Sequence, residues 1–394
     1  MLELDAVQTL ALAGLVLFLG YGICRWVPWF SRYNLPPPVI GGLVVAVVVL
    51  LAHQHGTILF TLDTRLQAPL MIAFFTTLGI NASVSLLRAS GRQVLLFLAL
   101  ASGFAVVQNL LGIAVAATFG LHPLFGVLAG SATLTGGPAT GLAFAPLFEQ
   151  AGVHGAASVA VASAMAGIVC GGLFCGPVAT WLMHRHRLHG GAPTLAPAQD
   201  VLQAVDPGAR EFDALKAIVV VLVAMWLGSG VSAVLAAAGL TLPAYIGAML
   251  VGAAIRALDD ASGWLKLPVV TIDLIGNVCL ALFLSVALMN LKLWELAGLA
   301  MPLLVNLGLQ VAAVAAFCAV VFRLMGRDYD AAVMSGGFVG FMLGTTANAM
   351  AVMRTLVDRY GIAPRAFLVA PLVGAFFIDF TNALIITSFL NFWH

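Results

Sequence analysis

Long apolar stretches dominate this chain, and short polar or glycine-rich segments separate them. About 20 apolar residues are enough to cross the hydrocarbon core of a bilayer as an α-helix. Stretches of about this length or longer occur at 5–24, 37–55, 66–87, 93–118, 153–183, 212–239, 242–258, 267–290, 295–322 and 364–391. The pattern predicts an all-α polytopic membrane protein with ten membrane-spanning helices.

Two segments rich in glycine and threonine interrupt the apolar pattern, one in each half of the chain. The first, at 121–150, contains the run Gly130–Gly141, and the second, at 330–357, contains the run Gly336–Asn348. Non-helical backbone survives at membrane depth only where protein surrounds it or a water-filled cavity adjoins it. A pair of such segments in corresponding positions of two halves is typical of the substrate site of a secondary transporter. We therefore expect two re-entrant hairpins that jointly bind a small polar solute.

The two halves resemble each other at a nearly constant spacing. Gly41 and Gly247, each within a similar proline-containing run, are 206 residues apart, and Gly137 and Gly344 are 207 residues apart. Five spans in each half reverse the orientation of the second half relative to the first. We therefore expect two inverted-topology repeats of five transmembrane helices, each with a re-entrant hairpin. The repeats are expected at 1–183 and 214–394, with a cytoplasmic linker at 184–213.

Basic residues set the expected orientation. When both re-entrant segments enter and leave on the same side, 15 of the 17 Lys and Arg residues fall on one side, with Arg65 and Lys292 on the other. Cytoplasmic loops of membrane proteins carry the excess of Lys and Arg. We therefore expect the N- and C-termini outside and the linker in the cytoplasm.

Composition supports a membrane protein and excludes several other classes. Hydrophobic residues make up 62% of the chain and charged residues 8%, whereas soluble domains carry roughly 25% charged residues. The net charge of +1 argues against nucleic acid as a partner, and the lipid bilayer is the expected surrounding. Neither a His-Glu-x-x-His motif nor a phosphate-binding loop occurs. We therefore expect neither an enzyme nor an ATP-driven pump.

The hairpin tips and two amides inside the fourth span are the candidate substrate-binding residues. Glycines let a ligand approach the backbone closely, and the N–H groups at the start of a short helix suit a carboxylate. The expected set is Thr135, Gly136, Gly137, Pro138, Ala139, Thr140, Gly141, Gly344, Thr345, Thr346, Asn348, Gln108 and Asn109. Helix packing is the alternative explanation for the glycines, and hydrogen bonding between helices is the alternative for the two amides.

Asp379 lies in the middle of the last apolar stretch. An acidic side chain at that depth is costly unless it faces a polar cavity or a cation. We expect Asp379 to help bind a coupling cation, with Asn382, Gly340 and Ser131 as further candidate ligands. A structural carboxylate that is hydrogen-bonded to a neighbouring helix is the alternative. No organic cofactor is expected.

Several stretches of this sequence match those of one known family. They include Leu35–Gly42, Asp63–Asn81, Gly130–Gly141, Leu291–Leu296, Tyr329–Val333 and Ala366–Asp379. The chain closely resembles the bacterial sodium/glutamate symporters over nearly its whole length. The resemblance implies Na⁺-coupled symport of glutamate by a multi-pass homodimer in the cell inner membrane. It also implies an architecture related to the citrate-type 2-hydroxycarboxylate transporters, in which a domain carrying both hairpins moves as an elevator.

Both hairpin tips depart from the family's pattern. Pro138 and Ala139 stand where the family usually has His-Gly, Met342 stands where Gly is usual, and Ala347–Asn348 replaces Pro-Thr. A Na⁺- or H⁺-coupled transporter of another dicarboxylate therefore stays open as an alternative. An ion channel is a further alternative, although the sequence shows neither a symmetric filter motif nor rings of like charge.

Overall fold

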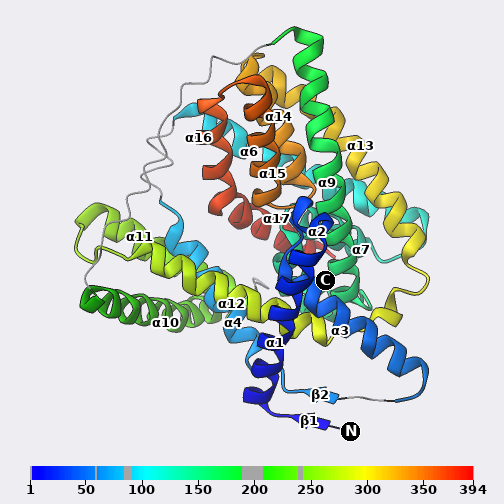
Figure 1. Ribbon diagram of the computed structural model, residues 1–394, viewed down its shortest axis with the longest axis vertical. Helices are drawn as coiled ribbons and strands as arrows, with labels where there is room; N and C mark the ends of the chain where they lie inside the picture. Colours follow the sequence, from blue (N-terminus) through cyan, green and yellow to red (C-terminus); the bar gives the residue numbers. More distant parts are fainter. Residues whose placement is uncertain (1, 58–59, 84–90, 189–206, 238–242, 394) are drawn as a thin grey trace.

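Helices make up nearly all of the secondary structure in this computed structural model, which describes residues 2–57, 60–83, 91–188, 207–237 and 243–393 (Figure 1). The longer helices are α1 (Ala6–Trp26), α3 (Pro37–Gln54), α4 (Gln67–Asn81), α6 (Arg92–Thr118), α8 (Gly137–Gln150), α9 (Ala156–His186), α10 (Pro207–Ala237), α11 (Ala244–Ser262), α12 (Val269–Met289), α13 (Ala300–Leu324), α14 (Tyr329–Met342), α15 (Thr346–Tyr360) and α17 (Ile378–Phe392). The shorter helical segments are α2 (Pro28–Arg32), α7 (Pro123–Val127), η1 (Leu128–Ala132), η2 (Leu293–Leu296), α16 (Pro364–Leu372) and η3 (Val373–Phe377).

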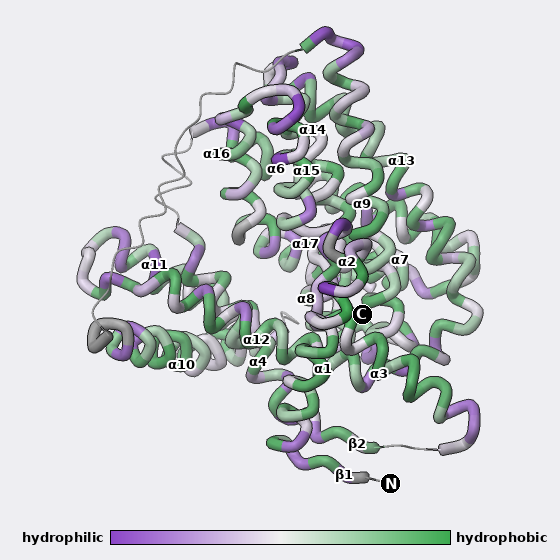
Figure 2. Tube along the Cα trace, in the orientation of Figure 1, coloured by the Kyte–Doolittle hydropathy of each residue, from purple (hydrophilic) through white to green (hydrophobic). Residues whose placement is uncertain are grey.

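Among the residues that the structure describes, seven helices are long and apolar enough to cross a membrane, namely α1, α3, α6, α9, α10, α12 and α13. Figure 2 shows hydrophobic residues along most of their length. The prediction of an all-α polytopic membrane protein is confirmed at this level. The other three expected spans also coincide with helices but differ in length or character. α4 has 15 described residues, α11 carries Arg256, Asp259 and Asp260, and the last stretch is divided into α16, η3 and α17.

A short parallel strand pair lies beside the first helix. β1 (Leu2–Leu4) pairs with β2 (Phe60–Leu62), with Leu2 opposite Phe60. The all-α prediction did not include this pair. Strands of three residues are too short to produce an alternating pattern in the sequence, so only the folded chain reveals them.

Much of the predicted linker at 184–213 lies outside the described residues. On its two sides, α9 ends at His186 and α10 begins at Pro207. The two inverted repeats, and the placement of both termini outside, stay predictions.

The helices form two groups that share an apolar contact zone. α4, α10, α11 and α12 pack on one another, and α1 and α3 pack against α12. α6, α9 and α13 surround two helical hairpins, α7–η1–α8 and α14–α15 (Figure 1). Between the groups, the ring of Tyr245 in α11 lies 5.9 Å from the ring of Phe144 in α8. The hairpins therefore belong to one group and face the other.

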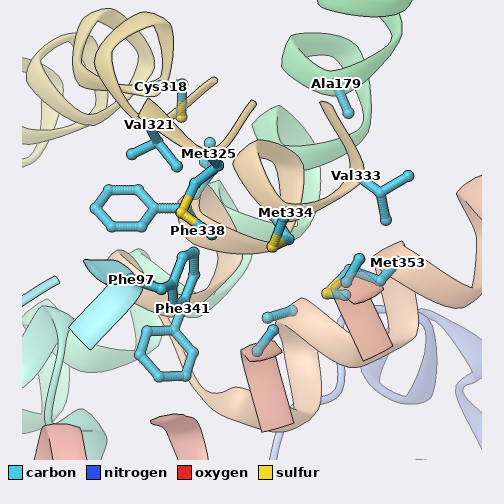
Figure 3. Packing of buried hydrophobic residues seen from close by; sticks show 14 of the residues in the cluster. Phe97, Ala179, Cys318, Val321, Met325, Val333, Met334, Phe338, Phe341 and Met353 are labelled. Carbon is cyan, nitrogen blue, oxygen red and sulfur yellow. The ribbon is translucent and has the colours of Figure 1, made fainter. Parts of the chain in front are cut away.

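A large buried cluster encloses the second hairpin (Figure 3). Phe97 of α6 packs against Phe338 and Phe341 of α14, at ring-centroid distances of 5.8 and 6.3 Å. Side chains of α13 and α15 complete the cluster. Every residue of α14 except Asp330 is buried. Protein therefore shields the arm that leads to the second tip, as a broken helix at membrane depth requires.

Truncation of Phe338 tests this core. Phe338 is fully buried, and its ring also lies close to those of Phe104 and Phe317. We expect Phe338→Ala to lower the free energy of unfolding by about 3–5 kcal/mol, because it removes buried apolar area and leaves a cavity. Thermal unfolding of the detergent-purified protein measures the loss. The control is Phe392→Ala, at a side chain that is 77% exposed; equal melting temperatures for the two variants would contradict the expectation.

Candidate functional site

A run of small residues breaks the first hairpin at its tip. Inside η1, Gly130 leaves helical geometry, with φ −102° and ψ −125°. The chain then turns, and α8 begins at Gly137, whose φ of +69° lies in the left-handed region that favours glycine. Pro138 follows in the first turn of α8, where its missing N–H removes no helical hydrogen bond. The chain therefore reverses direction at this tip within a few residues.

The second hairpin turns between α14 and α15. Asp328 caps the start of α14 by accepting a hydrogen bond from the N–H of Ala331 at 2.9 Å. Thr345 caps α15 in the same way, because its Oγ1 accepts from the N–H of Asn348 at 3.3 Å. Such a cap satisfies one of the free N–H groups at the start of a helix. The other free N–H groups of α15 are left at the tip of the hairpin.

The two tips meet at one cavity. A Cβ placed on Gly137 would lie 3.7 Å from both the carbonyl oxygen of Gly344 and Cγ2 of Thr345. The cavity beside them has a volume of about 580 Å³, which is within the range of small-molecule sites. Its lining includes the predicted residues Thr135, Gly136, Gly137, Pro138, Ala139, Gly344, Thr345, Thr346 and Asp379. α8 and α15 both begin here, and the partial positive charge at a helix N-terminus suits an anion.

The other walls of the cavity come from helices that the sequence did not point to. Tyr21 of α1, Pro38 of α3, Phe74 of α4 and Asn277 of α12 all line it. An apolar side chain that lines a cavity cannot be recognised as such from the sequence. Asn277 could have been recognised, because it is a polar amide inside an apolar stretch. Among the lining residues that the structure describes, Asp379 alone has a charged side chain.

Gln108 connects the two hairpins from behind the tips. Its Nε2 donates to the carbonyl oxygen of Met342 at 2.7 Å, and its Oε1 accepts from the hydroxyl of Thr135 at 2.5 Å. Gln310 of α13 in turn donates to the carbonyl oxygen of Gln108 at 2.8 Å. Gln108 is fully buried. Its side chain therefore holds the tips in position and does not face the cavity.

Three further predicted residues lie behind the tips, outside the cavity lining. Thr140 is buried in the first turn of α8. Gly141 packs closely against Ala160 of α9. Asn348 donates from Nδ2 to the carbonyl oxygen of Ile168 in α9 at 2.9 Å. α9 is thus the support against which one arm of each hairpin rests.

Two of the four predicted cation ligands meet at the break in the first hairpin. Asn382 of α17 donates from Nδ2 to the carbonyl oxygen of Ser131 at 2.9 Å, and the N–H of Ser131 donates to Oδ1 of Asn109 at 2.9 Å. All three residues are fully buried. Asn382 Oδ1, Ser131 Oγ and Asn109 Nδ2 have no partner among the described residues. Each such buried group costs about 1–3 kcal/mol, so the arrangement suits a small polar or charged guest.

The other two predicted cation ligands lie apart from each other. Asp379 is one helical turn before Asn382 in α17 and lines the cavity. Gly340 packs against Ala349 and Cys175, between the arms of the second hairpin and α9. Asp379 and Asn382, three residues apart on a helix, share a face. Gly340 has no described contact with that face.

Comparison with known proteins shows which family the chain belongs to. The family model described as sodium/glutamate symporter matches residues 2–362. The sodium/glutamate symporter of Escherichia coli (strain K12) is 40% identical over 394 residues, covering 99% of this chain and 98% of the relative. That of Haemophilus influenzae is 39% identical over 386 residues, covering 96% of this chain and 95% of the relative. The chain belongs to the sodium/glutamate symporter family.

Membership of the sodium/glutamate symporter family confirms the resemblance expected from the sequence. It also confirms that the protein is a transporter and not an enzyme. The family model ends at residue 362, before Asp379 and Asn382. The full-length relatives nevertheless cover 99% of the chain, so the likeness includes α17.

Replacement of Gln108 tests whether it holds the tips together. We expect Gln108→Ala to lower the free energy of unfolding by about 1–3 kcal/mol, because it leaves the carbonyl of Met342 and the hydroxyl of Thr135 buried without these partners. Thermal unfolding in detergent measures the change. The matched control is Gln150→Ala, at an exposed glutamine near the end of α8. A Gln108→Ala protein as stable as this control would rule out the proposed connection.

Proposed function

We propose that this protein is a secondary transporter that carries glutamate together with Na⁺ across the cell inner membrane. The family model and the names of the full-length relatives support this substrate and this ion. The structural observation that carries the proposal is the pair of helix N-termini, of α8 and α15, that open on one cavity beside Asp379. A dicarboxylate with one ammonium group has the charges that such a cavity accommodates.

In this proposal each helix N-terminus binds one carboxylate of the substrate. Free N–H groups and the helix dipole favour an anion at the start of α8 and of α15. The hydroxyls of Thr135 and Thr346 also line the cavity. Thr135 donates its O–H to Oε1 of Gln108, and Thr346 donates its O–H to the carbonyl oxygen of Gly374 at 3.0 Å. Each hydroxyl has one O–H, so in this proposal their oxygens act as acceptors for the ammonium group of the substrate. Gln108 and Asn348 keep the two tips at the separation that the substrate bridges.

Na⁺ binds, in the same proposal, along the face of α17 that carries Asp379 and Asn382. The Asp379 carboxylate, Asn382 Oδ1 and Ser131 Oγ are hard oxygen donors, which suit an alkali cation. The Nδ2 of Asn109 is a hydrogen-bond donor and therefore cannot be a ligand of the ion. Gly340 stays a prediction without a supporting contact.

We also infer that transport proceeds by an elevator-type movement within a homodimer, as the resemblance implies. The hairpins, α6, α9 and α13 form one group, which would carry the substrate. The aromatic contact of Tyr245 with Phe144 at 5.9 Å belongs to an apolar zone between the groups. Apolar contacts lack fixed partners, so they allow one group to slide against the other more readily than hydrogen bonds do.

The alternative function is transport of another dicarboxylate, coupled to Na⁺ or H⁺. Pro138 and Ala139 at the first tip favour it, because both line the cavity and stand where the family usually has His-Gly, so this tip presents a different surface to the substrate.

Uptake by the purified protein in proteoliposomes tests the substrate and the ion. We expect accumulation of radiolabelled glutamate when an inward Na⁺ gradient is imposed, and none when choline replaces Na⁺. Unlabelled D-glutamate, aspartate and citrate serve as competitors. If citrate inhibited uptake more strongly than unlabelled glutamate does, the alternative substrate class would replace glutamate. If uptake did not depend on Na⁺, the proposed coupling to Na⁺ would be wrong.

Neutralisation of Asp379 tests the cation site. We expect Asp379→Asn to raise the Na⁺ concentration for half-maximal uptake by about 10–100-fold, because interactions with a charged group contribute about 1.5–3 kcal/mol each. The control is Asp358→Asn, at an exposed position of α15. Thermal unfolding of both variants verifies that they fold. An unchanged Na⁺ dependence in a folded Asp379→Asn protein would show that Asp379 does not bind the ion.

A further inference from the structure

Another polar cavity lies between the C-terminal ends of α9 and α13. Its volume is about 470 Å³. The lining residues are Trp181, Leu182, Arg185, His186, Ala319, Phe322, Arg323 and Arg327. None of them lines the cavity at the tips. Figure 2 shows hydrophilic residues at this end of α9, beyond a long hydrophobic stretch.

Three arginines give this cavity a strong positive charge. Arg185, Arg323 and Arg327 are all exposed, and none forms a salt bridge with a described residue. The nearest acid in the sequence, Asp328, is already engaged by Arg365 at 2.5 Å, and it also caps α14. The cavity therefore lacks a described counter-ion and is complementary to an anion of more than one charge.

Aromatic and apolar side chains adjoin the charge. The guanidinium of Arg185 lies over the ring of Trp181, 5.5 Å from its centroid, and Trp181 is 56% exposed. The rings of His186 and Phe322 lie 4.8 Å apart, and both also line the cavity. Tryptophan is enriched where a membrane meets water. This composition suits an amphipathic guest better than a free inorganic ion.

Exposed apolar residues continue from the cavity along both helices. They are Leu173 and Phe174 on α9, and Val320 and Leu324 on α13. Both helices are long and apolar enough to cross a membrane. Leu173 and Phe174 lie about two helical turns before Trp181, which suits contact with acyl chains, whereas Val320 and Leu324 lie beside the charged end of α13. The excess of Lys and Arg on one side of a membrane protein explains basic residues at helix ends. This excess of basic residues does not, however, require that a cavity with an aromatic wall lie between the helix ends.

We propose that this cavity binds the phosphate headgroup of an anionic phospholipid, with its acyl chains along α9 and α13. Basic pockets between membrane helices are suited to such headgroups, and Arg binds phosphate through paired N–H groups. α9 and α13 both pack against α14 of the second hairpin. A lipid that joins their ends therefore stabilises the two helices that support that hairpin. The site is independent of the substrate and of the ion proposed above.

Binding of defined lipids to the purified protein tests this site without any transport measurement. Native mass spectrometry and thermal unfolding in detergent are recorded with added phosphatidylglycerol, cardiolipin or phosphatidylcholine. We expect an anionic-lipid adduct and a raised melting temperature with the first two and neither with phosphatidylcholine. The variant Arg185→Gln/Arg323→Gln/Arg327→Gln should weaken anionic-lipid binding on the order of a hundredfold. The corresponding triple Lys variant keeps the charge but loses the paired N–H groups, so it should bind more weakly than the unaltered protein and more strongly than the triple Gln variant.

A matched control removes the same charge elsewhere. Arg25→Gln/Arg32→Gln/Arg359→Gln alters three other exposed arginines and should bind the lipid as the unaltered protein does. Equal loss in the control and the test variant would overturn the proposal in favour of non-specific attraction. Equal stabilisation by soluble glycerol phosphate would overturn it in favour of a free-phosphate site. If the folded Arg185→Gln/Arg323→Gln/Arg327→Gln variant bound anionic lipid as well as the unaltered protein does, the cavity would not be the lipid site.

Discussion

Broken backbone inside a membrane protein must find its hydrogen-bond partners within the protein, and the rest of this structure depends on that constraint. Buried amide side chains supply many of the partners. Gln108 donates to the carbonyl of Met342, Asn306 to that of Ala129, and Asn382 to that of Ser131. Asn348 connects the second hairpin to the carbonyl of Ile168 in α9. Each of these amides comes from a different element than the carbonyl it satisfies. The same bonds that solvate the backbone therefore also fix α6, α9, α13 and α17 around the hairpins.

The two hairpins solve this problem with different chemistry. At the first, Asn382 donates to the carbonyl of Ser131 and retains an oxygen without a described partner. At the second hairpin, Cys175 and Gly336 stand about where the repeat spacing places the counterparts of Asn382 and Ser131. There Cys175 donates from Sγ to the carbonyl of Gly336 at 2.7 Å. A thiol and a glycine leave no comparable hard oxygen. The proposed cation site is thus confined to one hairpin, although both tips contribute to the proposed substrate site.

The sequence pattern predicted the segments that interrupt the apolar pattern. It did not predict the residues whose roles arise only from tertiary packing. The tips were predictable because glycine, threonine and proline stand out in apolar surroundings, and nine of the predicted residues line one cavity. Tyr21 and Phe74 were not predictable, because an apolar side chain that faces a cavity looks like one that faces lipid. The role of Gln108 was also hidden, since an amide in a span fits either a ligand or a backbone partner. Its two bonds to different hairpins appear only when the chain folds.

Charge at the proposed substrate site explains why an ion should accompany glutamate. The N-termini of α8 and α15 together supply roughly one positive charge. Asp379, alone among the described lining residues in carrying a charge, and a glutamate anion supply two negative charges. In the proposed function one Na⁺ would restore neutrality, so each ligand would strengthen binding of the other, and this coupling would be reciprocal. In the proposed elevator movement a neutral loaded site would also pass an apolar contact zone at lower cost than a charged one, so movement of the hairpins would depend on occupancy by both ligands.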